Sequence, residues 1–236
     1  MKVISLGWGV QSWAMVAMSA LGKLPKVDVA IHSDTGLERD GTKQFAKKWT
    51  PWLEKHGIEV VTVQANPNGR EGLFTGKEPG YLILPAFTSS VDGGSNGQLR
   101  RGCAKRLKIM PVRSWLFKHK SSEGIDLWLG ISKDERVRVK ESLVKYIHNC
   151  YPLVIEGYTR QDLVDWLVKV GLDVPQKSTC VCCPYHSMAV WKEIRACAAD
   201  WTVAVEVDEY IRARTEIRFA CYVHRKRIPL SEVSDF

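Results

Sequence analysis

Three cysteines fall within four consecutive positions of this chain, at Cys180, Cys182 and Cys183, and Pro184 follows them. Adjacent cysteines bridge one another poorly, whereas two thiolates separated by two residues in a turn can bind one soft metal ion or one iron–sulfur cluster. Cys103, within a basic stretch, is the best distant third ligand. The pattern predicts metal or sulfur chemistry at Cys103, Cys180 and Cys183, with Cys182 as a substitute ligand.

Three interpretations of these cysteines stay open. A structural zinc ion normally takes four protein ligands, and the sequence has no obvious second Cys-x-x-Cys pair. Three thiolates on a [4Fe-4S] cluster would leave one iron open to a sulfide or a substrate atom. Free or redox-active thiols are the third interpretation. Cys150, Cys197 and Cys221 have apolar or helical surroundings and are predicted to be buried small residues.

A glycine-rich turn, Ser-Leu-Gly-Trp-Gly-Val-Gln-Ser, occupies residues 5–12. Between a strand and a helix, such a turn lets backbone N–H groups approach a phosphate, and the helix N-terminus adds a favourable field. A tight turn without a ligand is the alternative. We predict a nucleotide site formed by Ser5, Gly7, Trp8, Gly9, Gln11 and Ser12, in which Trp8 packs over a base or closes the pocket.

Polar residues also follow two later predicted strands, at residues 27–31 and 126–132. In open α/β sheets, ligands bind outside the carboxyl ends of the strands. Both turns are therefore predicted to join the nucleotide site, through Asp34, Thr35, Gly36, Glu38 and Gly130. A capped turn without a ligand is the alternative for the first of them.

The loop after the last of these strands carries Asp134, Glu135 and Arg136 in succession. Two carboxylates beside an arginine can hold a magnesium ion and a phosphate, respectively. We predict that Asp134, Glu135 and Arg136 are catalytic and that Mg²⁺ binds there. An ordinary charged surface loop is the alternative.

The elements that must position these residues alternate in the first half of the chain. Strand patterns at residues 2–6, 27–31, 58–63 and 126–132 are separated by helix patterns at residues 10–21, 42–56 and 104–118. This alternation predicts an α/β fold, a Rossmann-like parallel sheet flanked by helices. Residues 66–101 lack a regular pattern. We expect an α/β nucleotide-binding domain at residues 1–150, and at residues 151–236 a helical C-terminal portion that carries the Cys-rich loop and packs on the same domain.

The composition is typical of a soluble globular protein, with 45% apolar and 25% charged residues in a chain of 236. The sequence lacks the run of about 18 apolar residues that a transmembrane helix needs, and it opens without a signal-peptide pattern. No membrane partner and a cytoplasmic location are therefore expected. The net charge of +8 favours an anionic partner, either a small-molecule nucleotide or a nucleic acid. A homodimer is compatible with the sequence.

These motifs resemble those of the PAPS reductase/PP-loop ATP pyrophosphatase family, which has an adenine nucleotide alpha hydrolase-like fold. Its Ser-x-Ser-Gly-Gly-x-Asp-Ser loop is matched here at Ser5, Gly9 and Ser12, and its next turn at residues 34–36. A phage-type subgroup with a Cys-x-x-Cys-Pro motif is more similar still. It shares the Gly-x-Gly-Val-Gln-Ser loop, the Gly-Ile-Ser-x-Asp-Glu segment and the Lys-Ser-x-Cys-x-x-Cys-Pro-Tyr run. The resemblance spans nearly the whole chain.

The resemblance implies an enzyme that binds ATP or a related adenine nucleotide and transfers sulfur. It would activate an acceptor, such as a nucleobase, by adenylation and use a [4Fe-4S] cluster, as similar enzymes do in tRNA thiolation, with Zn²⁺ as the alternative metal. A reductase of PAPS-like sulfonucleotides with redox thiols is a second function that the family allows. A non-catalytic module that binds a nucleotide or nucleic acid is a third.

The chain departs from the family at two places. Gln11 replaces the acidic residue of the ATP-cleaving loop, which puts magnesium-assisted release of pyrophosphate in question while leaving nucleotide binding. Near the C-terminus, the Glu-Cys-Gly-x-His tail of assimilatory PAPS reductases is represented only by Cys221 and His224, without the glycine and with different spacing. This difference argues against direct reduction of PAPS.

Overall fold

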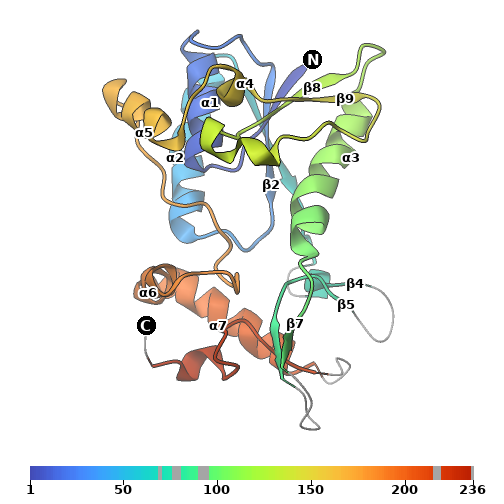
Figure 1. Ribbon diagram of the computed structural model, residues 1–236, viewed down its shortest axis with the longest axis vertical. Coiled ribbons are helices and arrows are strands. Elements are labelled where there is room, and N and C mark those ends of the chain that lie inside the picture. Colours follow the sequence, from blue (N-terminus) through green and yellow to red (C-terminus); the bar gives the residue numbers. More distant parts are fainter. Residues whose placement is uncertain (69–70, 76–80, 90–95, 215–218, 235–236) are drawn as a thin grey trace. The chain divides into compact units, whose positions relative to one another are not determined.

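The computed structural model describes residues 1–68, 71–75, 81–89, 96–214 and 219–234. Its internal contacts divide the chain into two compact units, and Figure 1 labels most of their elements. Unit 1 comprises Met1–Ser33, Gly41–Val63 and Met110–Ser178, and unit 2 comprises Asp34–Asp40, Gln64–Ile109 and Thr179–Phe236. The chain therefore contributes separate segments to each unit, and the division expected at residue 150 stays a prediction.

Unit 1 is built on a five-stranded sheet with the strand order β3-β2-β1-β8-β9. Its strands are β1 (Lys2–Ser5), β2 (Val29–Asp34), β3 (Glu59–Gln64), β8 (Ile125–Leu129) and β9 (Ile147–Cys150). β1 runs parallel to β2 and β8, and β8 runs parallel to β9. Because Ser5 at the end of β1 pairs with Leu129 at the end of β8, the loops that follow these strands begin side by side. The predicted parallel α/β sheet is confirmed.

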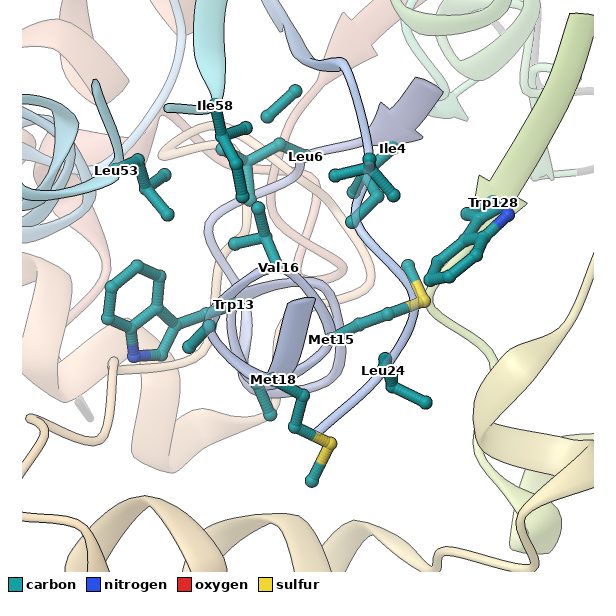
Figure 2. Close-up of a cluster of buried hydrophobic side chains, with 14 of the residues drawn as sticks. Ile4, Leu6, Trp13, Met15, Val16, Met18, Leu24, Leu53, Ile58 and Trp128 are labelled. Atoms are coloured by element: carbon teal, nitrogen blue, oxygen red, sulfur yellow. The ribbon is translucent and has the colours of Figure 1, made fainter. Parts of the chain in front are cut away.

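Helices pack on both faces of this sheet. They are α1 (Val10–Ala20), α2 (Asp40–Lys55), α3 (Met110–His119), α4 (Pro152–Ile155) and α5 (Arg160–Lys169). Ile4 and Trp128 pack in one apolar cluster with residues of α1, α2 and α5, part of which Figure 2 shows around α1. Val3 and Leu127, one position away in each strand, pack in another cluster with residues of α3. This alternation is the period expected of strands buried on both sides.

Unit 2 has its own apolar core and only short strands. Its elements are β4 (Phe74–Thr75), β5 (Tyr81–Leu82), β6 (Phe87–Ser89), β7 (Gly97–Gln98), β10 (Ala220–Tyr222), α6 (Met188–Ala196) and α7 (Ala198–Arg212). β10, β6 and β7 form one small antiparallel sheet, and β4 pairs with β5. The buried Asp208 of α7 accepts hydrogen bonds from the backbone N–H groups of Val223 and Leu230, both 3.0 Å away. Asp208 thereby attaches the segment after β10 to α7.

The structure differs from the sequence-based expectations in three places. β9 was not predicted, and short strands occur in residues 66–101, a stretch that also includes residues outside the described part. The helix expected at residues 104–118 is π-helical at Ala104–Ile109 and becomes α-helical from Met110 onward. Pro111, the second residue of α3, follows this π-helical segment directly, and it has no N–H group to donate to the preceding turn. Among the described residues, no helix combines the length and the apolar character needed to cross a bilayer.

Candidate functional site

The glycine-rich loop after β1 is anchored by a buried tryptophan. Trp8 has a φ of 54°, in the left-handed region that residues other than glycine rarely adopt, and it is only 2% exposed. Its indole packs against Trp13 and Phe45, with ring centroids 6.1 Å and 6.2 Å away. Because the ring belongs to the core of unit 1, it does not pack over a base, and Trp8 offers a ligand its backbone alone.

Two hydroxyl groups shape the same loop. Ser12 Oγ accepts a hydrogen bond from the N–H group of Gly7 at 3.2 Å and donates to the carbonyl oxygen of Gly9 at 3.2 Å. Ser178 Oγ, from the last residue of unit 1, donates to the carbonyl oxygen of Gly7 at 2.6 Å. Both side chains therefore hold the loop in shape. Ser5, the last residue of β1, directly precedes it.

Gly7 and Gly9 lie at the start of α1, where a small side chain would fit without a clash. Gly9 has a φ of −94°, which any residue can adopt, and Gly7 is not among the glycines with positive φ. A Cβ atom on Gly7 would meet nothing closer than Ser12 Oγ at 3.9 Å, and one on Gly9 would meet Ser178 Cβ at 3.6 Å. Neither the backbone nor the packing requires glycine here, so what these residues provide is access to the backbone.

The N-terminus of α1 is suited to an anion. No side chain caps it, and its first turn contains no acidic residue. The first N–H groups of a helix lack intrahelical acceptors and carry a partial positive charge. With the two glycines in front of them, these N–H groups can donate hydrogen bonds to the oxygens of a phosphate.

The loop after β8 lies against the first turn of α1. A Cβ atom on Gly130 would be 2.9 Å from the backbone nitrogen of Ser12 and 3.0 Å from its Cα. Backbone atoms cannot turn away as the end of a flexible side chain can, so glycine is required at this position. The structure thus brings together two of the predicted site segments, residues 5–12 and the loop that begins at Gly130.

Gln11 and Glu135 connect these two segments through their side chains. Gln11 Nε2 donates to Glu135 Oε2 at 2.9 Å and also approaches Ser132 Oγ at 3.4 Å. On the other side, Arg138 Nη1 donates to both oxygens of Glu135, each at 2.8 Å. Both oxygens of this carboxylate are therefore already engaged by donors of the protein.

The two other predicted catalytic residues are on the surface of the same loop. Asp134 Oδ1 accepts the N–H group of Arg160 at 3.2 Å. A hydrogen bond from the Ser132 hydroxyl is the main cause that holds the pKa of Asp134 below its usual value. Arg136 is exposed. This donor set fits the predicted Mg²⁺ site poorly, because Gln11 and Arg138 already engage both oxygens of Glu135, and Asp134 is the other predicted carboxylate.

The turn after β2 belongs to unit 2, where it is built around a buried carboxylate. Asp34 Oδ1 accepts the N–H group of Gly36 at 2.8 Å. Glu38 Oε1 accepts from the hydroxyl and the N–H group of Thr35, at 2.6 Å and 3.0 Å. Among the described residues, Glu38 Oε2 is buried without a hydrogen-bond partner. The predicted residues Asp34, Thr35, Gly36 and Glu38 thus form one compact turn.

The cysteine turn pairs with this segment inside unit 2. Glu38 and Cys180 form an isolated antiparallel bridge, and the N–H group of Val181 donates to the carbonyl oxygen of Leu37 at 2.8 Å. Thr35 Oγ1 lies 3.9 Å from Cys180 Sγ. Two sets of residues predicted separately, for the nucleotide and for the metal, are therefore neighbours.

The cysteine turn contains one buried thiol, that of Cys182, and two half-buried thiols, those of Cys180 and Cys183. Burial is the main cause that raises the pKa of Cys180 and Cys183, against the opposing effect of the Lys108 cation, and it raises the pKa of Cys182 well above its usual value. A metal would have to displace these protons, because the thiolate is the ligand. Within the part of the chain that the structure describes, no three Cys, His, Asp or Glu side chains are grouped in a way that could hold a metal ion. Cys103 nevertheless lies close enough to Cys182 and Cys183 for its charge to act on the pKa of both thiols. The predicted [4Fe-4S] or Zn²⁺ site at Cys103, Cys180 and Cys183 stays a prediction.

A buried ion pair attaches the turn of unit 2 to α7. Arg39 Nε donates to Asp200 Oδ2 at 3.3 Å, and the N–H group of Asp40 donates to Asp200 Oδ1 at 2.6 Å. Arg39 and Asp200 are 5% and 3% exposed. Arg39 Nη1 also donates to Glu193 at 2.8 Å, whose side chain is 58% exposed. The buried partner Asp200 therefore positions the segment that pairs with Cys180.

The sequence did not predict the hydrogen bonds that Ser132, Arg138 and Ser178 make in these loops. Ser178 stands in the Lys-Ser-x-Cys run, so its type and place were visible, but its contact with Gly7 spans 171 positions of sequence. Arg138 follows the predicted catalytic group by two positions. Its pairing with Glu135 is a helical-type spacing that a surface salt bridge could have suggested.

Two solved enzymes are similar to this chain in structure at low sequence identity. Phosphoadenylyl-sulfate (PAPS) reductase from Candida auris, in its phosphate complex, aligns with a TM-score of 0.46 and 11% identity over 74% of this chain and 74% of that chain. The U34-tRNA thiolase NcsA from Methanococcus maripaludis, with its [4Fe-4S] cluster, aligns with a TM-score of 0.44 and 15% identity over 88% of this chain and 71% of that chain. No protein-family model matches the sequence, and no curated protein matches it either.

Proposed function

We propose that this protein is a nucleotide-dependent enzyme of sulfur transfer and that it binds the phosphate groups of its nucleotide at residues 5–12. The observation that carries the proposal is the uncapped N-terminus of α1, which follows two glycines that neither the backbone nor the packing requires. The resemblance of this loop to that of the PP-loop family favours an adenine nucleotide.

The nucleotide would activate an acceptor by adenylation. An oxygen of the acceptor attacks the α-phosphate of ATP, the bond from that phosphorus to the bridging oxygen breaks, and pyrophosphate leaves. The N–H groups at the start of α1 would stabilise the negative charge on the phosphate oxygens, and the exposed Arg136 is a further cation in the neighbouring loop. A nucleobase of a nucleic acid is the acceptor that the net charge of +8 favours.

The cysteine turn of unit 2 would supply the sulfur chemistry. Cys180 and Cys183 lie in one turn, with the N–H group of Cys183 donating to the carbonyl oxygen of Cys180 at 3.3 Å. This arrangement also favours a second candidate, reduction of a sulfonucleotide by a pair of redox thiols, since a dithiol needs no third ligand. Release of sulfite from a sulfonucleotide would distinguish the reductase from the adenylating enzyme, which would release pyrophosphate. Iron and sulfide measured after anaerobic purification would decide whether a cluster is bound.

The phosphate site can be tested by adding one methyl group to the backbone at Gly9. Gly9→Ala is expected to leave the free energy of unfolding within about 0.5 kcal/mol of the wild type, since its Cβ makes an ordinary contact. The methyl group should block the approach of a phosphate and weaken ATP binding by at least about tenfold, or 1.4 kcal/mol. Isothermal titration calorimetry measures the affinity for ATP and for adenosine, and urea denaturation measures the free energy of unfolding. Adenosine, which has no phosphate, is the internal control, and an equal loss for both ligands would argue against a phosphate site at Gly9.

A further inference from the structure

Gln11 and Arg138 together donate hydrogen bonds to both oxygens of the Glu135 carboxylate. The Gln11 amide reaches Glu135 Oε2 at 2.9 Å, and the Arg138 guanidinium reaches both oxygens at 2.8 Å. Glu135 is the carboxylate that lies between the phosphate loop and the rest of the β8 loop. The Arg138 guanidinium therefore balances the charge of Glu135, and donors of the protein already bind both of its oxygens.

Magnesium makes demands that the remaining groups do not meet. Mg²⁺ requires near-octahedral oxygen coordination at about 2.0–2.1 Å and is usually held by one or two carboxylates together with the phosphates. With Glu135 engaged, the other carboxylate predicted to bind Mg²⁺ is the exposed Asp134, whose Oδ1 already accepts a hydrogen bond from the N–H group of Arg160. An amide N–H group, unlike a carboxylate, repels a cation.

We infer that this site binds its nucleotide without a divalent cation and that Gln11 is the residue that determines this preference. The inference rests on the proposed nucleotide site at residues 5–12. It deepens that proposal, because it names the form of the ligand: a nucleotide whose phosphates are not complexed with Mg²⁺. The N–H groups of α1 and the cationic side chains of the β8 loop then take the place of the metal.

The isosteric substitution Gln11→Glu is the sharpest test. It keeps the length of the side chain but replaces the donating Nε2 with a carboxylate oxygen, opposite a Glu135 oxygen that is 2.9 Å away in the wild type. Two carboxylates this close require a cation or a proton between them. Gln11→Met, which removes the amide without adding charge, is the matched control for loss of the hydrogen bond.

ATP binding is measured by calorimetry for the three proteins, in Mg²⁺ and in EDTA at matched ionic strength. For the wild type and for Gln11→Met, the ATP affinity in EDTA should stay within about twofold of the affinity in Mg²⁺. For Gln11→Glu, the ATP affinity should be at least about tenfold lower in EDTA than in Mg²⁺. Wild-type affinity that falls tenfold in EDTA overturns the inference and leaves the phosphate site intact. Failure of the wild type to bind ATP in both conditions overturns the phosphate site, and the inference with it.

A second readout needs no nucleotide. Mg²⁺ should raise the midpoint of thermal unfolding of nucleotide-free Gln11→Glu, because it binds only the folded pair of carboxylates, and it should leave the wild type and Gln11→Met unchanged. An equal Mg²⁺-induced rise in the wild type would mean that Glu135 and Asp134 already hold the ion, and the inference would be wrong.

Discussion

Replacing Asp200 with alanine is expected to lower the free energy of unfolding by about 3–5 kcal/mol, because it removes the buried partner of the Arg39 guanidinium and leaves only the exposed Glu193 as its counter-charge. The same substitution removes the acceptor of the Asp40 N–H group, 2.6 Å away in the wild type. The turn that pairs with Cys180 would lose its attachment to α7. Urea denaturation followed by circular dichroism measures the change.

Glu193→Ala is the matched control for this substitution, since it removes the other carboxylate on the same guanidinium. The Glu193 side chain is 58% exposed, against 4% for that of Asp200. An exposed ion pair contributes at most about 1 kcal/mol, so this variant should be nearly as stable as the wild type. Equal effects of the two substitutions would show that burial does not decide the energetics of Arg39.

Gly130→Ala is expected to destabilise unit 1 by about 1–3 kcal/mol, the usual cost of forcing an extra methyl group into a closely packed position. The added Cβ would lie 2.9 Å from the backbone nitrogen of Ser12. Relief requires the β8 loop and the first turn of α1 to separate, which would also move Gln11 away from Glu135. ATP affinity should therefore fall together with stability, in contrast to Gly9→Ala, where affinity falls alone.

Thermal unfolding and ATP titration of the two alanine variants side by side test this contrast. A Gly130→Ala protein as stable as the wild type would show that the two loops have room to separate, and the close contact described between them would then be incorrect.

The parts of the fold that follow from local pattern were predictable. β1 and β8 are short apolar runs, and glycine-rich or polar turns mark their ends, so the parallel sheet could be predicted from residue type and spacing. β9 was missed because its residues, Ile-His-Asn-Cys, include one buried side chain and three that reach solvent. A strand of this length and polarity resembles a loop in sequence and is defined by its pairing with β8.

The site was predictable as a set of segments, and its geometry was not. Gln11 could be recognised as a departure from an acidic position, but its hydrogen bond to Glu135 joins residues 124 positions apart. Arg39 and Asp200 are separated by 161 positions, and nothing in the local sequence shows that Asp200 is buried. Trp8 was assigned to a ligand pocket because of its neighbours. Its place in the core depends on Trp13 and Phe45, which only the packing of α1 against α2 brings to it.

The central claim is that phosphate groups bind at the start of α1, and hydrogen–deuterium exchange with and without ligand tests it most directly. ATP and inorganic pyrophosphate should both slow the exchange of the amides of residues 9–12, because these N–H groups would donate to phosphate oxygens, while adenosine should leave them unchanged. Slower exchange on ATP binding that is confined to other segments, with residues 9–12 unaffected, would contradict the account.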